Sequence, residues 1–116
     1  MANYVCSDIH GFYNRYITLL EKLNLKDDDT LFILGDAIDR GPDGIKILQD
    51  IMKRKNIVFF IGNHEYMMLD YLNDIATYGR PLSKNWLRDC NGGKATLSAF
   101  EALSESEKKR NFRIFK

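Results

Sequence analysis

The chain has 116 residues, of which 45% are hydrophobic and 28% are charged, and its formal net charge is +1. This size suits one domain with a modest core, and the balanced charge gives no electrostatic reason to expect binding to nucleic acid or to an anionic membrane. Two cysteines, Cys6 and Cys90, are too few for a disulfide framework, and no apolar run approaches the roughly 20 residues of a membrane span. A strand-like run begins close to Met1 and leaves no room for a signal peptide. We therefore expect a reduced, cytoplasmic protein.

Three short apolar runs bounded by polar turns predict buried strands at residues 4–7, 31–34 and 57–61. Apolar residues at helical spacing predict three helices as well. These helices cover residues 12–23, 42–55 and 65–78. Strands that alternate with helices are typical of parallel β-α-β units. The sequence therefore predicts an α/β fold with a three-stranded parallel β-α-β-α-β core and flanking helices.

The helical spacing also predicts which side chains face the core. The inward positions include Phe12, Met52, Ile75 and Tyr78. The basic residues 53–55 are placed in the last turn of the second helix, where cations complement the helix dipole.

Beyond Gly79 the helical pattern weakens. Residues 83–93 are predicted to form a loop, and residues 95–103 a short helix. Ser104 and Glu107 have the spacing of a capping box and predict the start of another helix.

Each predicted strand ends in a turn rich in polar side chains. The turns read DIHG at residues 8–11, GDAIDRG at 35–41 and GNHE at 62–65. Because the carboxyl ends of parallel strands meet at one edge of a sheet, we expect the three turns to lie together. They hold both histidines of the chain, His10 and His64.

The donors in these turns suit a pair of divalent cations. No glycine-rich nucleotide fingerprint follows any predicted strand, whereas oxygen and nitrogen ligands of this kind suit manganese, iron or zinc. Asp8 and His10, one residue apart, are able to point to one cation, and Asp36 has two oxygens with which to bridge to a second. Asn63 offers a neutral oxygen to that second ion. Two such ions activate water and neutralise a phosphoryl group, as in two-metal hydrolysis.

Three further side chains predict phosphoryl chemistry. His64 follows Asn63 directly and is placed to protonate a departing alkoxide, if another group holds its ring. Asp39 is the candidate for that group, and Arg40 offers a planar fork of donors that matches phosphate oxygens. Each pattern alone is common in turns and ion pairs, but their occurrence after three successive strands favours one joint site.

These motifs resemble the three N-terminal signatures of the calcineurin-like metallophosphoesterases. The Asp-Arg-Gly ending at residues 39–41 implies the phosphoprotein phosphatase branch, which includes serine/threonine protein phosphatases and symmetrical diadenosine tetraphosphatases. Trp86, followed by residues 91–93 and Thr96, is similar to a segment of the bacterial members. The resemblance implies a metal-dependent phosphoric ester hydrolase with two divalent ions, manganese being favoured over iron and zinc.

Carried over by position, the resemblance assigns metal binding to Asp8, His10, Asp36 and Asn63. It implies that His64 is the acid, that Asp39 is its partner, and that Arg40 holds phosphate. Asn63 is expected to bind the substrate together with Arg40. The expected partner is a phosphorylated substrate. A protein serine/threonine phosphatase-like activity is favoured, with diadenosine polyphosphates as the alternative, while phosphotyrosine and small phosphomonoesters also fit the residues present.

The chain departs from the family pattern in one respect. Family members supply further metal-binding histidines, and usually a second phosphate-binding arginine, from a C-terminal half. Here His10 and His64 are already assigned, so the second ion is expected to bind weakly and the isolated chain to be weak or inactive. A fragment of an active phosphatase is the favoured explanation. A short protein completed by a partner or a second copy, and a binding module without chemistry, are the alternatives.

We therefore expect one partial metallophosphoesterase domain over residues 1–116, half of the family's α/β sandwich. Residues 1–79 form its motif-bearing core, and residues 80–116 form a loop and short helices. The alternating pattern at 112–116 resembles the start of a further element. A half-sheet exposes an apolar edge and face, which predicts self-association.

Overall fold

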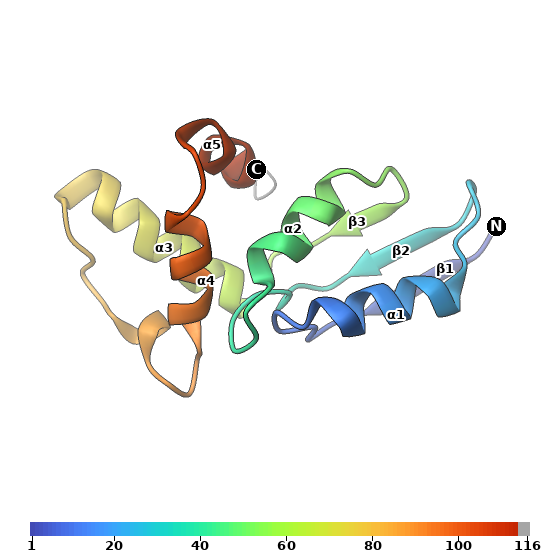
Figure 1. The fold of residues 1–116 in the computed structure, drawn as a ribbon, viewed down its shortest axis with the longest axis horizontal. Coiled ribbons are helices and arrows are strands. Elements are labelled where there is room, and N and C mark those ends of the chain that lie inside the picture. The colour runs from blue at the N-terminus through green and yellow to red at the C-terminus, as the bar shows by residue number, and fades with distance from the viewer. Residues whose placement is uncertain (114–116) are drawn as a thin grey trace.

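Three parallel strands form one sheet, with the first two helices of the chain beside it (Figure 1). In the computed structural model, which describes residues 1–113, they are β1 (Asn3–Cys6), β2 (Thr30–Ile33) and β3 (Ile57–Phe59), in that order across the sheet. The predicted α/β core is confirmed, because both strand pairs are parallel and helices follow all three strands.

Six helical segments complete the described chain. They are α1 (Tyr13–Leu23), α2 (Gly44–Met52), α3 (Asn63–Tyr78), the 3-10 turn η1 (Asn85–Leu87), α4 (Gly93–Glu101) and α5 (Glu105–Arg113). The helices α1 and α2 connect the strands, whereas α3 and the later helices lie beyond the carboxyl ends of β2 and β3 (Figure 1). Part of the element predicted over 112–116 belongs to α5, and residues 114–116 lie outside the described residues.

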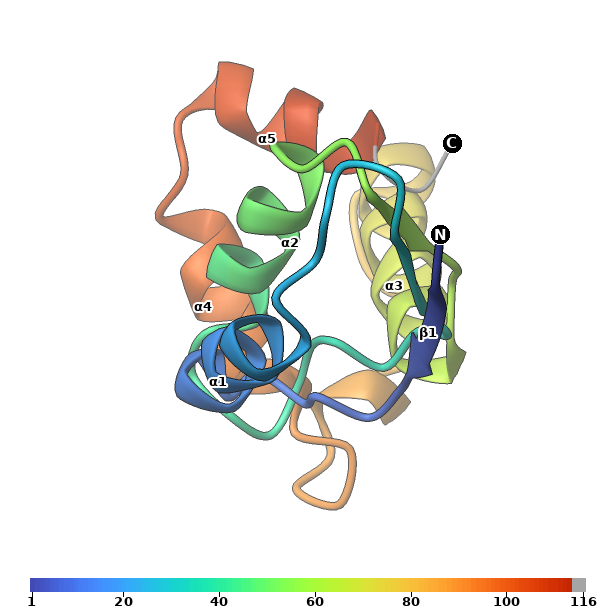
Figure 2. The ribbon, with the colours of Figure 1, turned by 90° about the vertical axis from the view of Figure 1, so that its right-hand side faces the viewer.

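The two faces of the sheet differ in their cover. Leu31 and Ile33 are fully buried in the core on the face that α1 and α2 cover (Figure 2). The strand register aligns Val5, Phe32 and Val58 across the other face. There Val5 is 64% exposed and Val58 is 40% exposed. One apolar face of the sheet is therefore open to solvent in the described part of the chain.

The helix α2 is shorter than predicted at both ends. It spans Gly44–Met52, whereas the sequence predicted residues 42–55. The N–H of Asp43 donates to the carbonyl of Gly11 at 2.9 Å, so this hydrogen bond holds the chain in a loop before the helix begins. The basic residues 53–55 follow the helix and are not in its last turn, so that prediction was wrong.

The helix α3 begins two residues earlier than predicted, at Asn63 and not at Glu65. The Glu65 carboxylate accepts the N–H of Gly62 at 2.8 Å, which satisfies a donor that precedes the first turn. Gly79 ends the helix with a φ of 75°, as the sequence predicted. Asn63 and His64 therefore occupy the first helical turn.

Four predicted inward side chains are exposed. Phe12 precedes α1, and its ring lies under the Arg15 guanidinium, 4.8 Å from the ring centroid. Met52 is at the end of α2, where the helix stops. Ile75 and Tyr78 lie on the last turn of α3, which extends past the core (Figure 1).

The segment after α3 has more regular secondary structure than the predicted loop. It contains η1, whose Trp86 is buried, and α4, which begins at Gly93 and not at residue 95. The capping box is confirmed: Ser104 Oγ accepts the N–H of Glu107 at 3.3 Å, and Glu107 accepts the N–H of Ser104 at 3.2 Å.

Candidate metal and phosphate site

Backbone hydrogen bonds hold the first two polar turns against each other. The N–H of His10 donates to the carbonyl of Asp36 at 3.0 Å, and the N–H of Gly11 donates to that of Ala37 at 2.8 Å. In the other direction, the N–H of Gly41 donates to the carbonyl of His10 at 2.9 Å. These bonds continue the contact between β1 and β2 beyond the strand ends, so the two turns form one unit.

Three predicted metal ligands meet in this unit. One ligand atom each from Asp8, His10 and Asp36 lies within 4.8 Å of the others. The Nδ1 of His10 is 3.0 Å from the carbonyl of Ile38, which only accepts, so Nδ1 carries the proton and Nε2 has a free lone pair. Nε2 lies 3.7 Å from Asp8 Oδ1. Two carboxylates and an oriented imidazole fit a divalent cation.

The third turn joins the cluster through Asp36. The N–H of His64 donates to Asp36 Oδ1 at 3.0 Å, and a Cβ on Gly62 would lie 2.6 Å from the same oxygen. Glycine at residue 62 therefore lets the start of α3 approach the carboxylate. The His10 and His64 rings are 4.7 Å apart and nearly perpendicular. Asn63 is exposed beside them, as the first residue of α3.

His64 is paired with the predicted carboxylate. Its Nδ1 lies 2.7 Å from Asp39 Oδ2, and both side chains are buried. Burial raises the pKa of Asp39, while hydrogen bonds from Thr96, His64 and Trp86 act in the opposite direction. With Nδ1 donating to the carboxylate, His64 Nε2 is the ring nitrogen left to meet a substrate.

Arg40 follows Asp39 and is exposed. Its backbone N–H donates to the carbonyl of Gly92 at 3.1 Å, which fixes the main chain. Its guanidinium is exposed and has a long contact of 3.5 Å from Nη2 to the carbonyl of Cys90. An exposed guanidinium of this kind is suited to phosphate oxygens.

Left-handed backbone is concentrated in these turns. Among the described non-glycine residues, positive φ occurs at Asn24, which ends α1, and at five residues of the first two turns. Those five are Asp8, His10, Asp36, Asp39 and Arg40. Such conformations cost energy for non-glycine residues and persist where the surrounding contacts fix them, most often at functional sites.

Comparison with known proteins shows to which family the chain belongs. Residues 2–109 match the calcineurin-like phosphoesterase family. The chain belongs to this family. The resemblance of the three motifs to it is thereby confirmed.

The chain is similar to several curated relatives that share one name. The symmetrical bis(5'-nucleosyl)-tetraphosphatase of Wigglesworthia glossinidia brevipalpis is 41% identical over 71 residues, which cover 60% of this chain and 26% of the relative. The enzyme of that name from Buchnera aphidicola subsp. Schizaphis graminum is 41% identical over 80 residues, which cover 67% of this chain and 27% of the relative. This calcineurin-like phosphoesterase chain thus spans about a quarter of the length of these relatives.

Three residues that hold the site were given no role by the sequence motifs. Glu65 is fully buried, and its carboxylate accepts backbone N–H groups from both the second and the third turn. Burial raises its pKa, while the N–H donors of Asp36, Gly62 and Ala37 act against that rise. Its place three residues after Gly62, a capping position, was the available signal.

The other two are Trp86 and Thr96, which donate hydrogen bonds to Asp39. The sequence matched them to a family segment but gave no contact. They lie 47 and 57 residues from Asp39 in the chain, too far for any local pattern to pair them.

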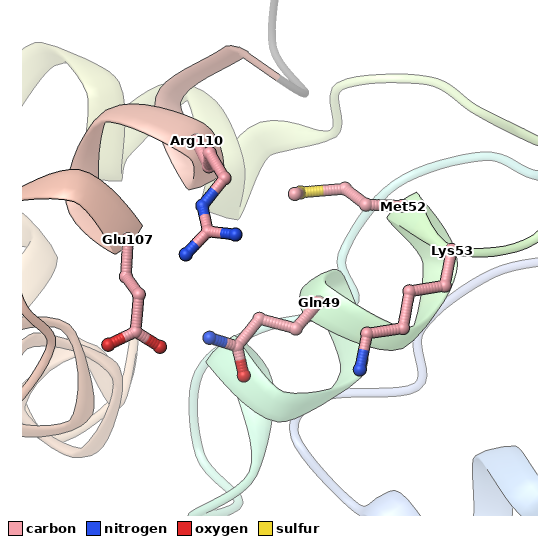
Figure 3. Close-up of a pocket in the computed structure, with 5 residues that line it drawn as sticks. All are labelled: Gln49, Met52, Lys53, Glu107 and Arg110. Atoms are coloured by element: carbon pink, nitrogen blue, oxygen red, sulfur yellow. The ribbon is translucent and has the colours of Figure 1, made fainter.

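A separate hollow lies between α2 and α5. It has a volume of about 320 Å³. It is lined by Gln49, Met52, Lys53, Glu107 and Arg110 (Figure 3). It contains none of the motif residues of the calcineurin-like phosphoesterases, so it is a different place from the site.

In the described part of the chain, no helix combines the length and the apolar character needed to cross a membrane.

Proposed function

We propose that this chain carries the metal-binding and proton-donating part of a metal-dependent phosphoric ester hydrolase. The observation that carries the proposal is the gathering of Asp8, His10 and Asp36 ligand atoms within 4.8 Å, in contact with the paired His64 and Asp39. Family membership supports it, because the match to the calcineurin-like phosphoesterases over residues 2–109 includes all of these side chains.

Each side chain has a distinct task in this proposal. Asp8, His10, Asp36 and Asn63 would hold divalent ions, which would supply Lewis-acid activation of water and neutralise phosphoryl charge. Arg40 binds phosphate oxygens and orients the substrate. The Nε2 of His64 gives its proton to the leaving oxygen, and Asp39 stabilises the imidazolium before that transfer. Manganese is our first choice of metal, with iron and zinc as alternatives.

For the substrate we favour dinucleoside polyphosphates over phosphoproteins. The relatives are named symmetrical bis(5'-nucleosyl)-tetraphosphatases, which favours the alternative of the sequence analysis over the protein serine/threonine phosphatase-like activity. In both cases the reaction is attack of water on a phosphorus atom with loss of an oxygen leaving group.

We further propose that the isolated chain is a partial domain with weak turnover. Its two histidines, His10 and His64, are both in use, so a second ion is left with Asp36 and Asn63. A fragment of a longer enzyme, a half-domain completed by a partner, and a binding module remain the three explanations.

Two free thiols, Cys6 and Cys90, support a reduced cytoplasmic setting.

The function is tested with 4-nitrophenyl phosphate, diadenosine tetraphosphate and a phosphoserine peptide. We expect turnover that requires added Mn²⁺ and is lost with a chelator, with diadenosine tetraphosphate preferred over the peptide. Calorimetric Mn²⁺ titration of the same samples separates a weak enzyme from a binding module. Absence of both turnover and Mn²⁺ binding would contradict the proposal.

We also propose that the open face of the sheet mediates self-association. Val5, Phe32 and Val58 form a continuous apolar row there, and Phe60 stacks on Phe32 with ring centroids 6.4 Å apart. Light scattering at high concentration should therefore show dimers or larger species, and Val58→Lys should reduce them.

The matched control is Leu82→Lys, which places the same charge on an exposed apolar residue away from the sheet. It should leave the association unchanged. A strictly monomeric wild-type chain, or equal effects of the two lysines, would rule out the sheet face as the contact.

A further inference from the structure

We propose that Trp86 and Thr96 are positioning residues that fix Asp39 and, through it, the ring of His64 for proton transfer. The inference rests on the proposed function, because His64 is the proton donor there. It assigns a role to a segment that lies outside the three metal-site motifs.

The Asp39 carboxylate is fixed from both sides. Its Oδ2 accepts hydrogen bonds from His64 Nδ1 and Trp86 Nε1, each at 2.7 Å, and its Oδ1 accepts one from Thr96 Oγ1 at 2.7 Å. Asp39 and Thr96 are fully buried, and Trp86 is 2% exposed. With donors on both oxygens and no solvent, the carboxylate plane is not free to rotate.

Thr96 holds the backbone of Asp39 as well as its side chain. Its Oγ1 accepts the N–H of Asp39 at 2.9 Å while its own proton goes to Asp39 Oδ1. One hydroxyl therefore fixes a residue whose φ of 75° is costly without such support. The indole N–H only donates, so Trp86 requires an acceptor at Oδ2 and favours the carboxylate form.

The segment itself is packed so that these donors are in place. A Cβ on Gly93 would lie 2.7 Å from Trp86 Cδ1, so the absence of a side chain lets α4 approach the indole. The Tyr71 ring lies 5.3 Å from Trp86 on the α3 side. The indole is thus held between α3 and α4 with its N–H directed at Asp39.

Two substitutions remove the hydrogen bonds to Asp39: Thr96→Val removes both bonds of the hydroxyl at nearly the same volume, whereas Trp86→Phe removes one bond and also shortens the side chain. Thr96→Val loses the hydroxyl, Trp86→Phe loses the indole N–H, and Thr96→Ser keeps the hydroxyl. The matched control is Thr18→Val, the same change at an exposed position of α1. If Trp86 and Thr96 serve only to fill the core, Thr96→Val should differ little from Thr18→Val in catalysis.

The first measurement is turnover of two substrates with Mn²⁺. For an alkyl phosphomonoester, which has a poor leaving group, we expect Thr96→Val and Trp86→Phe to lower kcat about tenfold, a part of the 10²–10⁴ that general acid catalysis supplies. KM should stay within about twofold, and 4-nitrophenyl phosphate should be affected less because its leaving group needs less protonation. Thr96→Ser should restore most of the loss. An equal loss on both substrates, or no loss beyond that of Thr18→Val, overturns the proposal.

The second measurement does not depend on activity. In the proton NMR spectrum, the His64 Nδ1 proton should be a slowly exchanging, strongly downfield resonance that His64→Gln removes. It should shift or broaden in Thr96→Val and persist in Thr96→Ser and Thr18→Val. A wild-type chain without this resonance, or one whose resonance is unchanged in Thr96→Val, overturns the proposal. A retained resonance in a chain that neither turns over nor binds Mn²⁺ would instead reject the proposed function and leave the positioning intact.

Discussion

Replacing Asp36 by Asn should abolish the Mn²⁺-dependent hydrolysis of 4-nitrophenyl phosphate and weaken Mn²⁺ binding by more than about 100-fold. Loss of a residue that only orients a metal ligand weakens metal binding by up to about 100-fold, and Asp36 is proposed to contact the metal itself. The carboxylate of Asp36 meets the donors of Asp8 and His10, and its Oδ1 also accepts the N–H of His64 at 3.0 Å. Asparagine keeps the size and one acceptor oxygen but removes the charge that a divalent ion requires. The loss should therefore fall on metal binding and leave the fold in place.

The measurement is a pair of titrations, turnover against Mn²⁺ concentration and calorimetric Mn²⁺ binding, on the wild type and the variant. Asp70→Asn, the same change at an exposed position of α3, is the matched control and should behave as the wild type. Activity that is equal in wild type and Asp36→Asn would point to a contaminating phosphatase or a different site. Circular dichroism of both variants shows whether the helices and strands are retained.

The arrangement of the site was largely predictable because it follows from strand order. Three apolar runs that end in polar turns form parallel strands, and such strands bring their carboxyl ends to one edge, where Asp8 and Asp36 meet. The pairing of His64 with Asp39 was also predicted, and the two side chains are 2.7 Å apart. Periodicity and topology were sufficient for the meeting of the turns, and the need of a catalytic imidazole for an orienting carboxylate indicated the pair.

The supports of the site were less predictable because they join distant parts of the chain. Thr96 contacts Asp39 across 57 residues, and Glu65 contacts Asp36 across 29. No local pattern specifies such contacts, since they depend on how helices pack after the strands have formed. The same limit explains the exposed Ile75 and Tyr78: helical spacing identifies an apolar face, but it does not show whether anything covers that face.

The buried carboxylate of Glu65 connects the second and third turns. Its Oε1 accepts the N–H groups of Asp36 at 2.6 Å and Gly62 at 2.8 Å, while its Oε2 accepts those of Ala37 at 2.9 Å and Ile38 at 3.4 Å. Burial raises the pKa of this group, so keeping its charge inside the protein is unfavourable by itself. The geometry that it imposes on the Asp36 backbone, whose φ is 56°, is what the residue contributes.

Glu65→Ala should lower the free energy of unfolding by about 3 kcal/mol or more, because several buried N–H donors lose their acceptor at a cost of about 1–3 kcal/mol each. Glu65→Gln retains one acceptor oxygen but turns an amide NH₂ toward the other N–H groups, so we expect a smaller loss of stability. Both variants should weaken Mn²⁺ binding by about 10–100-fold, because Glu65 orients the backbone of Asp36, the proposed metal ligand.

Urea denaturation gives the stabilities, and calorimetry gives the Mn²⁺ affinities. Glu21→Ala, an exposed glutamate of α1, is the control and should change the free energy of unfolding by less than about 0.5 kcal/mol. A Glu65→Gln variant that stays folded and binds Mn²⁺ as tightly as the wild type would mean that the turn holds Asp36 without this carboxylate. A Glu65→Ala variant as stable as the Glu21→Ala control would mean that the buried N–H groups find other acceptors.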